Sequence, residues 1–169
     1  RGLCSEVFEK VLNEHQLQEF EQTLEMNTGY ALEGVGNFRV SVMRQKGTPA
    51  FVVRYIPTEI PRFDTLNLPP VLLETVMEKR GLILMVGATG SGKSTTLTAM
   101  LDHRNANQSG HILTLEDPIE FIFRNKKAIV NQREIGADTK DFPVALRNAL
   151  RQAPDCIFIG EIRDKETMS

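Results

Sequence analysis

Two kinds of hydrophobic pattern follow one another along this chain. In residues 5–26, apolar side chains recur three and four positions apart, which predicts two short helices, the second capped by Asn13. In residues 38–43 and 50–56, apolar and polar side chains alternate, which predicts two strands. We expect these strands to pair antiparallel and to pack on the helices, as a small α+β domain over residues 1–57.

The second pattern consists of continuously apolar strands that alternate with helices. Four prolines between residues 57 and 70 first break regular structure, so residues 58–70 are expected to be a linker. The helices are predicted near 71–79, 93–103 and 141–150, and the strands at 82–86, 111–115, 128–131 and 156–159. Such an alternation is typical of a parallel sheet with both faces covered, so residues 71–169 are predicted to be an α/β domain.

A complete phosphate-binding motif lies between the predicted strand 82–86 and the helix that follows. It consists of Gly87, Ala88, Thr89, Gly90, Ser91, Gly92, Lys93 and Ser94, which match GxxxxGK[ST] at every fixed position. Glycines let successive backbone N–H groups turn toward an anion, and the helix N-terminus adds its positive end. We therefore predict that the chain binds ATP with Mg²⁺. Lys93 would reach the β- and γ-phosphates, Ser94 would bind Mg²⁺, and Thr95 would contact the α-phosphate.

Two carboxylates that directly follow predicted strands are candidates for the hydrolysis of that nucleotide. Glu116 follows the strand 111–115, and Glu161 follows 156–159 after one glycine. Ligand sites in parallel sheets lie beyond the carboxyl ends of the strands, so both are expected to face the phosphate loop. Glu161 would then be a magnesium-side carboxylate, and Glu116 would polarise the attacking water. Two alternatives stay open: a solvated Glu161, and a capped helix start at Asp117-Pro118.

Composition and charge set limits on these predictions. The 169 residues hold 20 Lys and Arg against 22 Asp and Glu, a net charge of −2, which gives no electrostatic reason to expect nucleic acid as a partner. The two cysteines are far apart and predict no disulfide framework, with Cys156 expected to be a small core residue. The longest apolar run, 82–86, is too short to cross a bilayer, so we expect a cytoplasmic location, at most peripheral to a membrane.

Several short segments, in a fixed order, carry a resemblance that spans nearly the whole chain. They are residues 34–41, 80–82, 94–100, 111–121, 131–134, 149–155 and 159–163. Together they resemble the secretion ATPases that drive pili and type II secretion, and within them the type IV pilus retraction ATPases of the PilT/PilU type. Residues 111–121 resemble the family's Asp box, and Gly160-Glu161 resembles its form of the Walker B motif. The residues at 87–90, 151–154 and 166–168 favour the PilU-like branch.

The resemblance implies a RecA-like ATPase core preceded by a PAS-like domain, assembled as a homo-hexamer with nucleotide between the domains. It implies that Glu116 is the catalytic glutamate and that Glu161 is the Walker B ligand of a magnesium-bound water. It also implies that Arg39 and Arg54 lie near the γ-phosphate, where guanidinium groups neutralise charge; the strand pattern alone predicts a solvated face for them.

The resemblance also implies partners and a size. The partners are a platform protein of the pilus base at the inner membrane and, as a further candidate, a paralogous pilus ATPase. The family's histidine-containing motif and helical C-terminal region are expected after residue 163, and the first part of its PAS-like domain before residue 1. Both domains are therefore expected to be partial here, which puts the activity of this fragment alone in question.

Three functions fit these motifs. The first is a Mg²⁺-dependent ATPase motor that powers pilus retraction and twitching motility by nucleotide-driven domain closure. The second is a nucleotide-binding accessory subunit, with little turnover of its own, that couples to another pilus motor. The third is a nucleic-acid translocase built on the same core fold, and the absence of a basic stripe argues against it.

Overall fold

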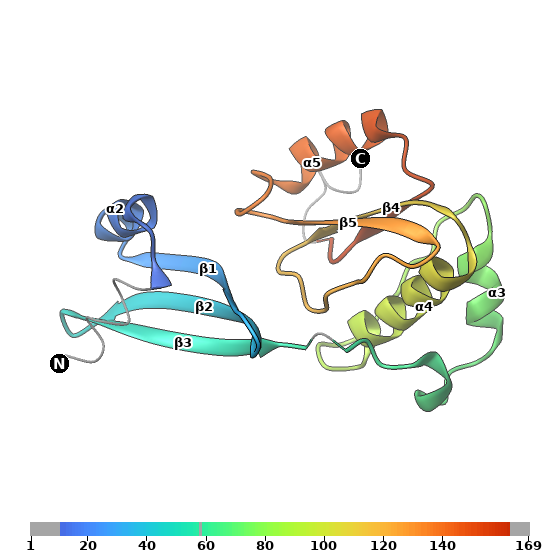
Figure 1. Ribbon diagram of the computed structural model, residues 1–169, viewed down its shortest axis with the longest axis horizontal. Coiled ribbons are helices and arrows are strands. Elements are labelled where there is room, and N and C mark those ends of the chain that lie inside the picture. Colours follow the sequence, from blue (N-terminus) through green and yellow to red (C-terminus); the bar gives the residue numbers. More distant parts are fainter. Residues whose placement is uncertain (1–10, 58, 163–169) are drawn as a thin grey trace. The chain divides into compact units, whose positions relative to one another are not determined.

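The computed structural model describes residues 11–57 and 59–162. The chain divides into two compact units, residues 1–57 and 58–169. Figure 1 labels the helices and strands of both units. Most of the first predicted helix lies outside the described residues.

The helix of the first unit begins at the predicted cap. α2 spans Glu14–Thr23. The Asn13 side chain accepts a hydrogen bond from the Gln16 N–H (2.9 Å), and the Gln16 side chain accepts one from the Asn13 N–H (3.0 Å). This reciprocal pair satisfies two N–H groups that the first turn leaves without helical partners. The helix ends at Leu24, whose φ of 64° is left-handed, so the predicted helical pattern up to residue 26 was wrong at its end.

Three strands, rather than the two predicted, form the antiparallel sheet of this unit. β1 (Glu25–Leu32), β2 (Gly36–Gln45) and β3 (Thr48–Ile56) lie in that order. β2 and β3 confirm the prediction, whereas β1 was missed. Its sequence contains Asn27 and Gly29, which are poor strand formers. β1 is a strand because it pairs with β2 along its whole length, and not because of its own strand propensity. The pairing runs from Glu25 opposite Met43 to Leu32 opposite Gly36.

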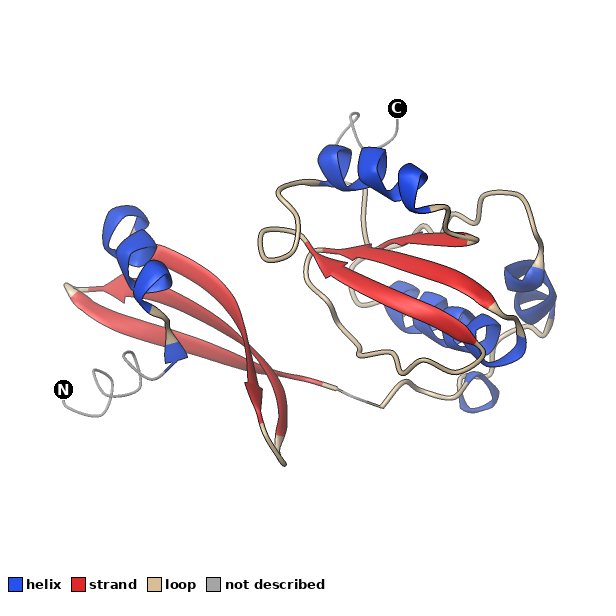
Figure 2. Cartoon of the chain, turned by 45° about the horizontal axis from the view of Figure 1, so that its top comes forward, coloured by secondary structure: helices blue, strands red, loops and turns tan. Residues whose placement is uncertain are grey.

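α2 packs on one face of this sheet (Figure 2). The side chain of Phe20 is 1% exposed and lies in one cluster with Val40 and Val42 of β2. Residues two apart on a strand share a face, so Arg39 and Ser41 lie on the opposite face. The alternation that predicted the strand therefore also identified its buried side.

The second unit contains a parallel sheet with helices on both faces, as predicted. Its strands are β4 (Gly110–Glu116), β5 (Ala128–Glu134) and β6 (Cys156–Ile159), in the order β5-β4-β6. Its helices are α3 (Val71–Met77), α4 (Lys93–Asn107) and α5 (Phe142–Ala149), with 3₁₀ turns at Phe63–Thr65 and Leu150–Gln152. α4 and α5 lie on opposite sides of the sheet in Figure 1.

The central strand β4 contributes side chains to the cores on both faces of the sheet. Leu113 and Leu115 are fully buried against Ala145 and Ala149 of α5. Ile112 packs on the other side in a cluster that includes Leu101 of α4, and Cys156 joins this cluster as predicted. On the α4 side the strand continues with Thr114 and Glu116, so that face changes from apolar to polar toward the carboxyl end of the strand.

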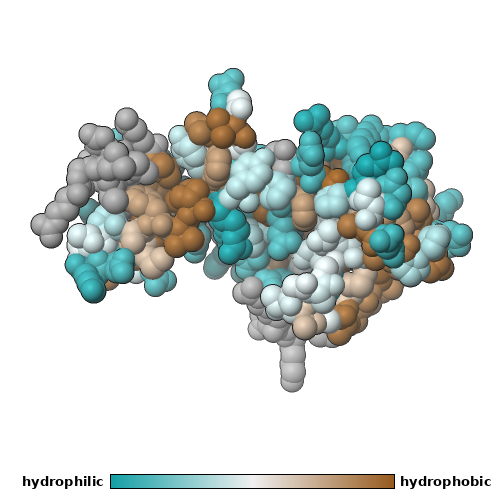
Figure 3. Space-filling model, turned by 90° about the horizontal axis from the view of Figure 1, so that it is seen from below, coloured by the Kyte–Doolittle hydropathy of each residue, from teal (hydrophilic) through white to brown (hydrophobic). Residues whose placement is uncertain are grey.

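The predicted strand Leu82–Val86 was wrong. These residues have no regular secondary structure, and Leu82 and Val86 are 86% and 82% exposed. Figure 3, coloured by hydropathy, shows that brown hydrophobic patches also interrupt the hydrophilic surface on one face of the molecule. A strand requires a hydrogen-bonded partner as well as an apolar composition. Within residues 11–57 and 59–162, no strand pairs with this run.

Within the described residues, no helix combines the length and the apolar composition that crossing a bilayer requires.

Candidate functional site

The phosphate loop is an exposed segment whose shape depends on glycine. Gly90 and Gly92 have φ values of 79° and 88°, which glycine adopts without strain. A Cβ at Gly87 would meet the Ser91 hydroxyl oxygen at 2.9 Å, so a side chain at the first position of the loop would require the Ser91 hydroxyl to move. The backbone conformation therefore accounts for two of the glycines in the motif, and a close side chain accounts for the third.

The N-terminus of α4 is open to an anion. Gly92 is the N-cap of this helix and makes no side-chain capping hydrogen bond. The first N–H groups of a helix have no helical acceptor, and the helix dipole makes this end positive. A phosphate group fits this end of the helix, because it supplies acceptors and negative charge together.

Lys93 curls back into the loop. Its ammonium group donates hydrogen bonds to the carbonyl oxygens of Gly87 (2.8 Å) and Ala88 (2.7 Å). Phosphate oxygens are stronger acceptors for an ammonium group than neutral carbonyls. The lysine is thus held at the loop by weak partners that a triphosphate can replace.

A pocket beside the loop collects residues from three elements. It is lined by Ser94 and Thr98 of α4, Glu116, Asp117, Pro118 and Glu120 from the end of β4 and beyond, and Phe158, Gly160 and Glu161 from the end of β6 and beyond. The structure thus brings together three predicted site residues: Ser94, Glu116 and Glu161. Thr95, half-buried in the first turn of α4, is not among the lining residues.

Gly160 lies where the ends of β4 and β6 meet. Its N–H donates to the Leu115 carbonyl at 2.8 Å, which continues the ladder one residue beyond β6. A Cβ at Gly160 would lie 3.4 Å from the Glu116 Cα and 3.5 Å from its Cγ. The following residue, Glu161, is thereby placed at the same edge of the sheet as Glu116.

Glu116 is a buried carboxyl group held by side-chain donors. Its side chain is 5% exposed, and its Oε1 accepts hydrogen bonds from the Thr114 hydroxyl (2.6 Å) and the Gln132 amide (3.1 Å). Burial raises the pKa of Glu116, and the charge of Glu120 adds to this effect; the donors Thr114 and Gln132 and the Glu120 N–H oppose it. A raised pKa makes this carboxylate a better proton acceptor than a solvated one.

The segment after Glu116 is irregular, so the alternative of a helix starting at Asp117 was wrong. Residues 117–127 form no helix. We call them the β4–β5 loop. The side chains of β5 supply acceptors to it: Glu134 Oε2 accepts from the Ile119 N–H (3.0 Å), and Gln132 Oε1 accepts from the Phe123 N–H (2.8 Å). These bonds replace the helical ones that the sequence pattern suggested.

The residues present fit a magnesium ion bound together with phosphate. Mg²⁺ prefers oxygen ligands, keeps several waters, and is usually held by one or two protein groups plus substrate phosphates. The pocket offers the Ser94 hydroxyl and the Glu161 carboxylate. Among the described residues, no three His, Cys, Asp or Glu side chains converge on one point, so no all-protein metal cage is found there.

Arg39 and Arg54 lie directly opposite each other on β2 and β3. They share the face of the sheet that α2 does not cover. Two like charges side by side are unfavourable unless an anion is close. The ion pairs between described residues are Arg62–Asp64 and Lys126–Asp102, and neither arginine takes part in them. Both arginines belong to the first unit, whereas the other predicted site residues belong to the second.

Among the polar residues at this site that were not predicted from the sequence are Thr98, Thr114 and Gln132. Thr98 lies one helical turn after Ser94, and Thr114 lies two residues before Glu116 on the same strand face, so their spacing could have identified them. Gln132 is different, because it reaches Glu116 from another strand. Only the pairing register, with Thr114 opposite Gln132, places it there.

Comparison with known proteins identifies relatives over most of the chain. The family described as Type II/IV secretion system protein matches residues 22–169. The type IV pilus ATPase PilU of Pseudomonas aeruginosa is 50% identical over 158 residues, which are 94% of this chain and 41% of that protein. PilT of the same organism, a type IV pilus retraction ATPase, is 46% identical over 94% of this chain and 46% of that protein.

A solved structure resembles the whole fold. It is the crystal structure of the pilus retraction motor PilT with bound ADP, with a TM-score of 0.94 and 49% identity over 97% of this chain and 48% of that one. The family and the α/β fold class predicted from the sequence are thus confirmed. The chain spans less than half the length of each of these three proteins.

Proposed function

The chain belongs to the Type II/IV secretion system protein family, and from this premise we propose that it is part of an ATP-hydrolysing motor that powers type IV pilus retraction. One observation carries the proposal. Ser94 at the phosphate loop and the carboxylates Glu116 and Glu161 line a single pocket, although they come from three different elements. A site for phosphoryl transfer to water requires this combination of groups.

Each residue has a distinct role in this proposal. The backbone N–H groups of residues 87–92 and the first turn of α4 bind the phosphates, and Lys93 exchanges its carbonyl partners for the β- and γ-phosphates. Ser94 binds Mg²⁺, Glu161 orients a magnesium-bound water, and Thr95 contacts the α-phosphate. When bound, Mg²⁺ neutralises charge that develops on the phosphate oxygens. Glu116 orients the attacking water and accepts its proton.

The first unit contributes arginines to the same reaction. Arg39 and Arg54, paired across β2 and β3, are proposed to approach the γ-phosphate when the PAS-like domain (1–57) closes on the ATPase domain (71–169) about the linker 58–70. Their adjacent positive charges fit an anion as a shared partner. We propose that six copies of the natural-length protein form a hexamer, with nucleotide between the domains, in which this closure performs mechanical work.

The relatives support a place at the pilus base. Proteins similar to this chain are described as a type IV pilus ATPase, a pilus retraction motor and, in Neisseria gonorrhoeae, a twitching motility protein. We propose that the natural-length protein works in the cytoplasm at the inner membrane, on a platform protein of the pilus base. A paralogous pilus ATPase is a further proposed partner.

Phosphate release by the natural-length protein tests the residue roles. We expect Lys93→Ala to abolish turnover through loss of nucleotide binding, and Glu116→Ala to abolish it while binding persists. Undiminished turnover in either variant would contradict the corresponding role. The purified wild-type protein, assayed alone, tests the accessory alternative: tight ATP binding without measurable turnover would favour an accessory subunit over a motor.

A further inference from the structure

Gln132 makes three hydrogen bonds that join the β4–β5 loop to Glu116. Its Oε1 accepts from the Phe123 N–H (2.8 Å), and its Nε2 donates to the Phe121 carbonyl (2.8 Å) and to Glu116 Oε1 (3.1 Å). A side-chain amide has two N–H donors, and both are used here. The side chain is half-buried and lies on the same strand face as Thr114, its partner in the register.

We propose that Gln132 is a positioning residue for hydrolysis, which fixes the Glu116 carboxylate and ties its orientation to the β4–β5 loop. This inference rests on the proposed function, in which Glu116 orients and deprotonates the attacking water. Thr114 and Gln132 both donate to the same oxygen, Oε1, so this oxygen already accepts two hydrogen bonds from protein groups. The rotation of the carboxylate is therefore set before a water molecule is bound, and pre-organisation of this kind lowers the barrier for proton transfer.

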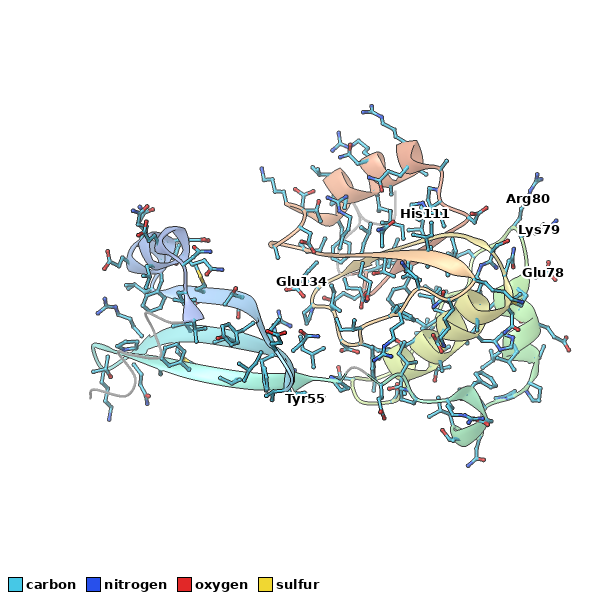
Figure 4. The ribbon with its side chains drawn as sticks, in the orientation of Figure 1. Tyr55, Glu78, Lys79, Arg80, His111 and Glu134 are labelled. Carbon is cyan, nitrogen blue, oxygen red and sulfur yellow. The ribbon has the colours of Figure 1, made fainter. Side chains whose placement is uncertain are left out.

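Within the described residues, Glu134 anchors the β4–β5 loop without a hydrogen bond from its side chain to Glu116, so it can be compared with Gln132. It lies two residues further along β5, on the same face, at the end of the strand, and it is labelled in Figure 4. Its Oε2 accepts from the Ile119 N–H (3.0 Å), so it also holds the β4–β5 loop. It makes no hydrogen bond to Glu116 among those found between described residues. The two side chains thus separate loop anchoring from contact with the carboxylate.

Neighbouring carboxylates disfavour the charged form of Glu116, so its hydrogen-bond donors, Thr114 and Gln132, are important for keeping it ionised. Asp117, Glu120 and Glu161 line the same pocket, and the α4 residues that line it, Ser94 and Thr98, are neutral. On β5, the carboxylate-bearing Glu134 lies opposite Glu116 in the register. A buried carboxylate among other carboxylates is stabilised in its charged form chiefly by hydrogen-bond donors. Burial raises the pKa of Glu116, and the Gln132 amide counteracts this rise. Loss of the amide would raise that pKa further and reduce the fraction of Glu116 that is ready to accept a proton.

The test compares pH profiles of ATP turnover in the natural-length protein. Gln132→Met removes the amide and keeps the length of the side chain, and Glu134→Met is the matched control on the same face. We expect Gln132→Met to lower kcat roughly ten-fold, the effect of one lost hydrogen bond to a charged group. KM should change less than about two-fold. The acidic limb of its kcat profile should move to higher pH. The limb of Glu134→Met should not move to higher pH, because this variant keeps the amide and loses a negative charge opposite Glu116.

A second variant keeps the test decisive if Gln132→Met folds poorly. Thr114→Val removes the other donor to Oε1 without touching the β4–β5 loop, and it should move the acidic limb in the same direction. Each change is also made in a Glu116→Gln background, where Gln132→Met should cause no further loss because the two residues act as a unit.

The outcomes distinguish failure of the catalytic role of Glu116 from failure of the positioning role of Gln132. If Glu116→Gln keeps wild-type turnover, the catalytic role of Glu116 fails and the role of Gln132 fails with it. If Glu116→Gln is inactive but Gln132→Met has the kcat and pH profile of Glu134→Met, then the proposed function stands. In that case Gln132 only anchors the loop, and its positioning role is overturned.

Discussion

The phosphate loop and the carboxylate edge are two halves of one candidate site, and they are built in opposite ways. The loop, residues 87–94, is mostly exposed, and Lys93 finds its hydrogen-bond partners within the loop itself. The carboxylate edge, at the ends of β4 and β6, is held by long-range contacts: Glu116 is buried and bonded to Gln132 of another strand. The proposed binding groups are thus provided locally, whereas the proposed hydrolytic group depends on the packed sheet.

This difference separates function from stability. Substitutions in an exposed loop with local bonds change the free energy of unfolding little, because few partners are lost. Substitutions at a buried, hydrogen-bonded edge change stability and chemistry together. The following variants of the natural-length protein test this contrast, from the largest expected effect to the smallest.

Lys93→Ala should have the largest effect on activity. We expect ATP turnover to fall at least about 100-fold, since one charged contact to a transferring phosphate contributes several kcal/mol. The free energy of unfolding should change by less than about 0.5 kcal/mol, because the lysine bonds only to carbonyls of its own loop. Urea unfolding and phosphate release measure the two quantities. A large loss of stability would show that the loop is not locally built.

Asn105→Ala should have the largest effect on stability. Asn105 is fully buried on α4, where its amide donates to the Arg124 carbonyl (2.8 Å) and accepts from the Lys126 N–H (3.2 Å). The substitution leaves both backbone groups without these partners, so the free energy of unfolding should fall by about 2–3 kcal/mol. The matched control is Asn107→Ala on the same helix, an exposed site where a change below about 0.5 kcal/mol is expected. Equal effects of the two substitutions would contradict the assigned role of Asn105.

Gly160→Val should damage the edge where β6 approaches β4. A Cβ at this position makes an ordinary contact with the Glu116 Cα, whereas the additional methyl groups of valine overpack the site. We expect a loss of about 1–3 kcal/mol in the free energy of unfolding for valine, with slower turnover, and a smaller loss for the control Gly160→Ala. Thermal unfolding of the two variants measures the difference. Wild-type behaviour of the valine variant would show that the two strand ends are less close than the structure indicates.

Glu116→Gln should change stability less than Asn105→Ala or Gly160→Val, and the sign of the change is informative. Burial raises the pKa of this carboxyl group, so its contribution to stability is fully present below the unfolded-state pKa and is lost as pH rises through the folded-state pKa. The neutral amide of glutamine does not ionise, so it does not lose stability as pH rises. The variant should therefore be more stable than the wild type at pH 8, and the gap should close in acid. A variant that is less stable at every pH would contradict the burial argument.

The sequence predicted the loop far better than the edge, for a physical reason. The motif at 87–94 is contiguous, and its proposed function follows from local backbone conformation, so spacing alone was enough to select it as a candidate. Glu116 and Glu161 were predicted because residues that follow parallel strands share one edge of a sheet. Gln132 was missed because its role depends on the register between β4 and β5, which no local pattern encodes.

The fold shows the same difference between features that depend on local sequence and features that depend on strand pairing. The cap at Asn13 and the strand Cys156–Ile159 were predicted from local signals, and the structure confirms both. β1 was missed because pairing with β2, rather than strand propensity, forms it. Leu82–Val86 was wrongly predicted as a strand because an apolar run indicates burial but does not supply a hydrogen-bonded partner.

The most direct test of the central claim measures ATP affinity and phosphate release on one variant, Glu116→Gln, in the natural-length protein. If the loop binds and the carboxylate edge hydrolyses, the variant should bind ATP within about three-fold of the wild type, while phosphate release falls at least about 100-fold. Turnover within two-fold of the wild type, or a loss of binding as large as the loss of turnover, would contradict this division of work.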